Sequence, residues 1–190
     1  MKSSIILTAA VFLLLSCSGT KVQITRPGKG IVPGKSGGRL LLGMKSEEAK
    51  KILGNNPSVK SYQSEYDDYT EFGYTPENEQ VFKIGFDYLL EYKPETNISD
   101  IPAWKLYFKN NRLVYINFSN FIYPEISQNY RTPTGLFFKT RKEIKDILGN
   151  DGIFTNNGNL NYNYPRKGIL VIFTENEPDR LRVIHIFDPL

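Results

Sequence analysis

The chain has 190 residues, of which 40% are hydrophobic, so it is long enough for one domain or two small ones and apolar enough to build a core. Its single cysteine, Cys17, lies at the edge of an N-terminal apolar segment, which excludes a disulfide framework and a cysteine-based zinc site from the rest of the chain. The formal net charge of +4 comes from the N-terminal tail, because from Leu40 onward 18 bases stand against 20 acids, a net charge of −2. A nucleic-acid-binding protein needs a basic face on a folded domain, and we therefore expect no nucleic acid among the partners.

The first sixteen residues have the pattern of a secretory signal peptide. Lys2 is followed by the apolar stretch from Ile5 to Leu15. Its eleven residues are too few to span a membrane as a helix, which needs about 20. We therefore predict a cleaved signal peptide over residues 1–16.

The end of this stretch, Leu14-Leu15-Ser16-Cys17, resembles the lipobox of bacterial lipoproteins. The resemblance implies cleavage before Cys17, a thioether-linked lipid on its sulfur and an acylated new amino terminus. Ser18 after the cysteine resembles the outer-membrane sorting pattern of enterobacteria. The expected location is therefore the cell envelope, held by lipid at the outer membrane. The alternative is an ordinary signal peptide with an incidental cysteine.

Residues 17–39 are rich in glycine and proline, lack apolar periodicity, and carry five bases and no acid. This composition predicts a flexible, basic tether after the lipid, with structure beginning near Leu40. Near an anionic membrane surface, each of its bases would add about 1 kcal/mol to binding.

Two similar helix patterns lie 95 residues apart, at residues 43–55 and 138–150. Both carry a stripe of aliphatic side chains and are followed by a glycine, which favours the end of a helix. Ser46 is the expected N-cap of the first helix. Thr140 and Glu143 have the spacing of a capping box in the second.

Runs of apolar and aromatic residues predict strands after each helix. The first set covers Val81–Tyr92, Trp104–Phe108 and Leu113–Phe118, with a hairpin turn at 109–112, and the second covers Leu160–Tyr164, Gly168–Thr174 and Leu181–Phe187, with a turn at 175–179. The expected fold is therefore α+β, with two units that each combine a short helix with an antiparallel β-meander. The first unit spans residues 40–125 and contains an insertion at 62–80, and the second spans residues 131–190.

Gly43-Met44 before a short helix, followed by Leu53-Gly54-Asn55-Asn56-Pro57 and a strand hairpin, resembles the SmpA/OmlA (BamE) family of small outer-membrane lipoproteins. Two such units in one chain resemble the β-lactamase inhibitor protein family, whose fold repeats a helix-plus-sheet unit in tandem. The second copy lacks the Gly-Met pair and the proline after the glycine. Both resemblances imply binding to another protein without catalysis, either as accessory work in outer-membrane assembly or as inhibition of an exported enzyme.

The sequence offers few groups for catalysis, and we name no catalytic residue. The only histidine, His185, alternates with apolar residues in the last expected strand, where a surface or satisfied core position is its common role. No nucleophile elbow and no phosphate-binding glycine loop occurs, so we expect neither a cofactor nor a metal. A carboxylate-based hydrolase of envelope polymers stays an alternative, because paired carboxylates meet only in the folded chain.

The insertion combines six acids and no base with several aromatic residues. Its acids predict a solvated loop, a cation site or a docking surface for a basic partner. Its aromatic residues predict either core packing or a surface that contacts a protein or a glycan, because tyrosine contacts a partner at low entropic cost. We expect a non-enzymatic protein-binding module that contacts an unidentified envelope protein. The candidate contact residues are Tyr62, Tyr66, Tyr69, Phe72 and Tyr74.

Overall fold

The computed structural model describes residues 31–54, 56–92, 104–119, 140–156, 158–175 and 177–190. The expected signal peptide, the lipid site at Cys17 and residues 17–30 of the expected tether lie outside the described residues. In the described part, helices pack on antiparallel sheets and strands predominate, so the protein is α+β, as the sequence predicted in outline.

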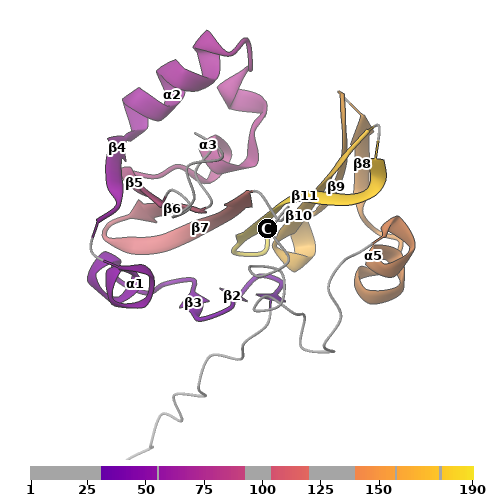
Figure 1. The fold of residues 1–190 in the computed structure, drawn as a ribbon, viewed down its shortest axis with the longest axis horizontal. Coiled ribbons are helices and arrows are strands. Elements are labelled where there is room, and N and C mark those ends of the chain that lie inside the picture. The colour runs from indigo at the N-terminus through magenta and orange to yellow at the C-terminus, as the bar shows by residue number, and fades with distance from the viewer. Residues whose placement is uncertain (1–30, 55, 93–103, 120–139, 157, 176) are drawn as a thin grey trace, which may run out of the picture.

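Eight antiparallel strands form the main sheet, in the order β4-β5-β6-β7-β11-β10-β9-β8. Their bounds are β4 Ser58–Ser61, β5 Tyr88–Tyr92, β6 Trp104–Lys109, β7 Arg112–Ser119, β8 Ile153–Asn156, β9 Asn159–Tyr164, β10 Ile169–Thr174 and β11 Glu177–Phe187. The first four strands form one meander and the last four form another, and the two meet where β7 pairs with β11. Among the described strands, β4 and β8 are therefore the edges of the sheet (Figure 1).

Helices cover both faces of this sheet (Figure 1). Their bounds are α1 Ser46–Leu53, α2 Tyr62–Glu71, α3 Gln80–Ile84 and α5 Arg141–Leu148, with short 3-10 helices η1 Pro76–Asn78 and η2 Pro165–Lys167. A small three-stranded sheet consists of β1 Ile31–Val32, β2 Ser36–Gly37 and β3 Leu40–Leu41. It lies with α1 and α5 on one face, whereas α2 and α3 cover the first meander on the other.

Each face of the sheet has its own apolar core, because successive side chains of a strand point to opposite faces. On the α1 and α5 face, Ala49 and Leu148 join a cluster that includes Ile184 of β11. On the α2 and α3 face, Phe82 joins a cluster that includes Tyr107 of β6. The first meander is thus enclosed between two layers of helix.

The two repeated helices end as predicted. Gly54 follows α1 with a φ of 106°, and Gly149 follows α5 with a φ of 84°, values that favour glycine. The predicted capping box of α5 is also confirmed. Thr140 Oγ1 accepts a 3.2 Å hydrogen bond from the backbone of Glu143, whose carboxylate accepts a 2.7 Å bond from the backbone of Thr140.

The start of α1 differs from the prediction. Ser46 is the first helical residue rather than the N-cap, which is Lys45. The Ser46 hydroxyl instead donates a 2.8 Å hydrogen bond to the side-chain oxygen of Asn111 in the β6–β7 turn. That turn is the predicted hairpin, and Asn110 and Asn111 both have the positive φ values, 50° and 55°, of a type I′ turn. The Ser46 hydroxyl thus bonds to a residue 65 positions away instead of capping α1, and the local sequence does not reveal this partner.

Three boundary predictions were wrong. The run from Val81 to Ile84 is helical, and only Tyr88–Tyr92 of the predicted strand pairs in the sheet, because a short apolar run fits either structure. The predicted turn at 175–179 is shorter, since β11 begins at Glu177. Structure also begins before Leu40: residues 31–39, which were assigned to the tether, include the strands β1 and β2.

The small sheet is part of the core rather than part of a tether. Ile31 is only 1% exposed and packs in the α1 and α5 core. Gly37 lies so close to Phe118 of β7 that an added Cβ would come within 1.9 Å of the ring. The glycines of this segment therefore permit close packing here, in addition to the flexibility that their composition suggested.

Candidate protein-binding surface

The insertion of the first meander is a folded subdomain rather than a solvated loop. It leaves the sheet at the end of β4, forms α2 and η1, enters α3 and returns to β5. Ser61 caps α2, with its side-chain oxygen accepting a 3.2 Å hydrogen bond from the backbone of Ser64. The corresponding connection in the second meander, from β8 to β9, spans only two residues.

Three of the five predicted contact residues hold this insertion together. Tyr62, Tyr66 and Tyr69 lie along one side of α2 and place their rings edge-on around Phe82 of α3. The ring centroids are 5.5, 5.8 and 5.1 Å from that of Phe82, within the usual range for aromatic pairs. All three tyrosines are half-buried, so their main contacts are within the protein.

The other two predicted contact residues are accessible. Phe72 is 77% exposed and Tyr74 is 57% exposed, among the largest values for apolar side chains in the described part of the chain. They flank Gly73, whose φ of 77° turns the chain at the end of α2. Aromatic side chains are enriched where proteins contact one another, so these two exposed rings are candidate contact residues.

Exposed acidic side chains lie on both sides of this turn along the chain. Asp67, Glu71 and Glu77 are exposed, and no basic residue occurs between positions 62 and 80. Tyr66 Oη donates a 2.5 Å hydrogen bond to Glu77, and this bond holds the pKa of Glu77 below its ordinary value. The carboxylate is therefore ionised at neutral pH. We call the exposed group of Asp67, Glu71, Phe72, Tyr74 and Glu77 the acidic-aromatic tip.

A buried carboxylate ties α2 to the sheet beneath it. The side chain of Glu65 has no solvent exposure, and its Oε1 lies 2.6 Å from Nζ of Lys105 on β6. The hydroxyl of Tyr107, on the same strand, donates a 3.0 Å hydrogen bond to the same oxygen. A buried carboxylate is tolerated only with such compensation, so these contacts fix the position of α2.

Lys60 extends this network to the edge strand β4. Its Nζ is 2.6 Å from Asp68 of α2 and 3.3 Å from Glu91 of β5. Burial acts to lower the pKa of Lys60, but the hydrogen bond to Asp68 and the charges of Glu91 and Glu65 outweigh it, and the pKa is raised. Two lysines and three carboxylates thus connect α2 with β4, β5 and β6.

This network also bears on a hydrolase based on paired carboxylates. Glu65 and Glu91, the two buried carboxylates of the described residues, come close together because both lie against Lys105. Lys60 contacts both of them as well. Glu65 has no solvent exposure and Glu91 is only 5% exposed, so this pair of carboxylates links the insertion to the sheet.

His185 is a core residue. It is 7% exposed, and its Nδ1 lies 2.5 Å from the hydroxyl of Tyr115 on β7. Burial lowers the pKa of His185 to about 3, and the charge of Lys105 acts in the same direction. The imidazole is neutral at physiological pH and has a hydrogen-bond partner.

The lysines were the part of this region that sequence reasoning missed. Lys105 lies 40 residues from Glu65, and no local pattern connects them. One signal was present, however. In a helix, Glu65 lies on the same face as Tyr62, Tyr66 and Tyr69. An acid on an aromatic face that packs on the sheet would be buried and would need a basic partner.

Among the described residues, no helix is long and apolar enough to cross a membrane. No group of three or more His, Cys, Asp or Glu side chains among them is arranged to hold a metal ion.

Comparison with known proteins gave no relative: no protein-family model, no curated protein and no solved structure matches the chain.

Proposed function

We propose that this protein is a lipid-anchored, non-enzymatic binding module of the bacterial cell envelope, which contacts another envelope protein through the acidic-aromatic tip. The observation that carries the proposal is the exposure of Phe72 and Tyr74, at 77% and 57%, on an insertion that the rest of the molecule holds in place. Aromatic side chains on a rigid support bind a partner with little loss of conformational entropy.

The charge of the tip indicates the chemistry of the partner. Asp67, Glu71 and Glu77 are exposed around the two rings, and residues 62–80 contain no base. A partner surface with lysine or arginine around an apolar patch would match both features, and its cations could also lie over the rings.

The position of the tip supports an anchored arrangement. Ile31, the first described residue, packs on the α1 and α5 face of the sheet. Helix α2 lies on the opposite face (Figure 1). In the proposed arrangement, the chain that leads from a lipid at Cys17 enters the described structure on the face opposite α2.

A tandem relationship between the two units is part of this proposal, and one repeated contact supports it. Tyr92 at the end of β5 donates a 3.2 Å hydrogen bond to the carbonyl of Gly54, the residue that ends α1. Tyr164 at the end of β9 donates a 3.2 Å bond to the carbonyl of Gly149, the residue that ends α5. In both units a strand begins four residues after the glycine, at Ser58 or Ile153. The first residue of that strand pairs with the residue that directly precedes the tyrosine. This agreement supports a tandem repeat of one helix-plus-sheet unit.

A photo-crosslinking experiment in intact cells tests the proposed surface. A photoreactive amino acid at Phe72 in the full chain should give one dominant covalent product with an envelope protein. The same amino acid at Val59, which is 64% exposed on β4, is the matched control and should not give that product. Adding Glu71→Lys and Glu77→Lys to the Phe72 probe should reduce the product several-fold.

The identity of the product separates the two kinds of partner. A component of outer-membrane assembly would support an accessory role, whereas an exported enzyme that loses activity on binding would support inhibition. Equal labelling from Phe72 and Val59, or no protein product from Phe72, would contradict the proposed surface.

A further inference from the structure

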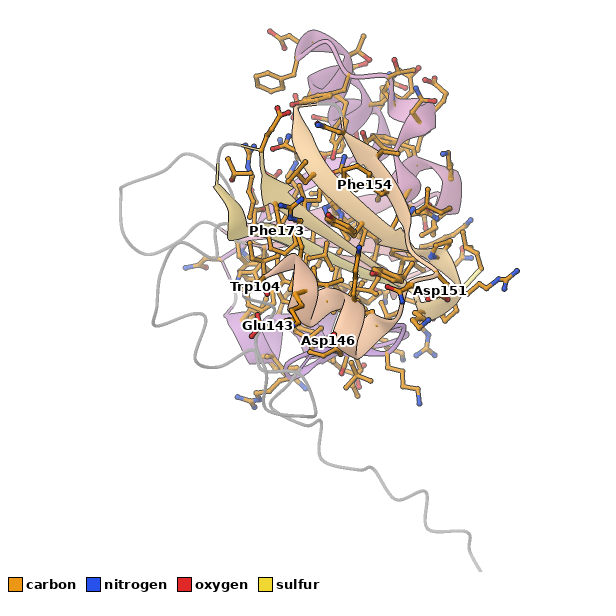
Figure 2. The ribbon with its side chains drawn as sticks, turned by 90° about the vertical axis from the view of Figure 1, so that its right-hand side faces the viewer. Trp104, Glu143, Asp146, Asp151, Phe154 and Phe173 are labelled. Carbon is orange, nitrogen blue, oxygen red and sulfur yellow. The ribbon has the colours of Figure 1, made fainter. Side chains whose placement is uncertain are left out.

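Strand β8 is an edge of the main sheet in the described part of the chain. Within the described part of the chain it pairs only with β9, so one side of its backbone has no strand partner there. All four of its residues are exposed, including Ile153 at 56% and Phe154 at 51%. Figure 2 looks onto this side of the molecule and labels Phe154. Natural sheets usually protect such an edge, so an apolar, uncharged one indicates a place where another strand adds.

The opposite edge strand, β4, contains a charged residue. There the chain runs from β4 directly into α2, and Lys60 of β4 is held by Asp68 and Glu91. Strand β8 has no insertion after it and contains no charged residue in its sequence Ile-Phe-Thr-Asn. Strand β8 therefore lacks the charge by which many edge strands avoid pairing.

We propose that β8 pairs antiparallel with β8 of a second copy of this chain, with the two Phe154 residues opposite each other. Paired residues must point to the same face of a continuous sheet, which permits Phe154 opposite Phe154 and Ile153 opposite Thr155 but not Phe154 opposite Thr155. In this register two aromatic rings meet, and each already contacts Tyr162 of β9 at a centroid distance of 5.1 Å.

A second copy is the occupant that the observations favour. Because β8 has no charged residue, a basic or acidic partner strand would form no ion pair with it. Pairing of two β8 strands brings no like charges together. The chain also joins its own two meanders in this manner. Their last strands, β7 and β11, pair antiparallel with Asn117 opposite His185. The proposed contact would join two copies of the chain in the same antiparallel manner, through the β8 strand of each copy.

Disulfide cross-linking of the full chain tests this register. Cys17 is the only native cysteine, so the amount of disulfide-linked dimer from each variant is compared with that from the unsubstituted chain. Phe154→Cys should give a disulfide-linked dimer under mild oxidation, because facing Cα atoms of an antiparallel pair are about 4.5–5.5 Å apart. Thr155→Cys alone should give at least about tenfold less dimer, because its two copies would be about 8 Å apart, beyond disulfide reach.

Two further samples make the result specific. A mixture of Ile153→Cys and Thr155→Cys chains should form a mixed dimer, because these positions face each other in the proposed register. Val59→Cys, exposed on the opposite edge strand β4, should give no more dimer than the unsubstituted chain. These positions are exposed, and an unchanged urea midpoint will show that each variant folds. Absence of the Phe154→Cys dimer, an equally strong dimer from Thr155→Cys or Val59→Cys, or cross-linking of Phe154→Cys to a different protein would overturn the proposal.

Discussion

Lys105 on β6 and Glu65 on α2 form a buried ion pair with 2.6 Å between Nζ and Oε1. Lys60, 4.0 Å from the other Glu65 oxygen, is too far away to replace this bond. Lys105→Met would leave a buried carboxylate poorly compensated, and we expect a loss of about 3–5 kcal/mol in the free energy of unfolding. Urea unfolding at pH 7 measures it.

The matched control is the exposed pair of Lys50 and Glu47, one turn apart on α1. Lys50→Met should cost less than about 0.5 kcal/mol. Adding Glu65→Gln to Lys105→Met should restore part of the lost stability, because the buried charge is then removed. Equal losses for Lys105→Met and Lys50→Met would show that the buried pair does not hold α2.

His185 should make the protein sensitive to acid. Its ordinary pKa is 6.5 and burial lowers it to about 3, so between these values the unfolded chain binds a proton that the folded chain does not. Stability therefore falls as the pH falls through this window, by about 1.4 kcal/mol per pH unit. His185→Asn, whose side-chain oxygen can replace Nδ1 as partner of Tyr115, removes this contribution.

Urea unfolding of both chains at pH 7 and pH 5 isolates the effect of the histidine. The carboxylates titrate in both chains, so they cancel in the difference. The native chain should lose about 2 kcal/mol more than His185→Asn between these two values. Parallel losses would mean that His185 is protonated in the folded protein.

The features that the sequence predicted well are those decided by neighbouring residues. The Thr140 and Glu143 box is three residues long, and the Asn110-Asn111 turn needs only two residues that tolerate positive φ. The alternation of Leu160, Tyr162 and Tyr164 likewise marks the buried side of β9 without reference to distant residues.

The features that it missed depend on contacts between distant segments. Ser46 leaves the cap because Asn111, 65 residues away, accepts its hydrogen bond. Strand β8 has no buried residue, so it lacks the apolar alternation by which β9 was recognised. The aromatic residues of the insertion divide into a group that packs around Phe82 of α3 and an exposed pair, Phe72 and Tyr74, and the local sequence does not tell them apart.

The two tyrosine contacts at the helix ends should contribute equally. Tyr92→Phe and Tyr164→Phe each remove one hydroxyl that donates to a glycine carbonyl at 3.2 Å. Each should cost about 0.5–1.5 kcal/mol in the free energy of unfolding, and the double variant should lose the sum, because the residues lie in different meanders. Denaturant unfolding of the three variants is the measurement. A large effect from one tyrosine and none from the other would argue against equivalent units.

The anchor can be tested apart from the fold. Cys17→Ala removes the sulfur to which a thioether-linked lipid would be attached. We expect it to abolish labelling by a fatty-acid precursor and to release the protein from the membrane fraction or leave the precursor uncleaved. Ser16→Ala, which keeps a small residue before the cysteine, is the control and should remain labelled. Labelling that persists in Cys17→Ala would rule out the lipoprotein assignment.

Gly168 should be far less tolerant of a side chain than Gly158, although both have positive φ, 67° and 86°. An added Cβ at Gly168 would come within 2.1 Å of the carbonyl oxygen of Phe187 and 2.7 Å of Cα of Gly34, whereas at Gly158 it would meet nothing within 4 Å. Gly158→Ala therefore costs only the backbone preference, about 1–2 kcal/mol. Gly168→Ala adds overpacking against two backbones and should cost about 3 kcal/mol or more. Thermal or urea unfolding of the two variants compares them directly, and similar losses would show that the chain at Gly34 and Phe187 can move aside.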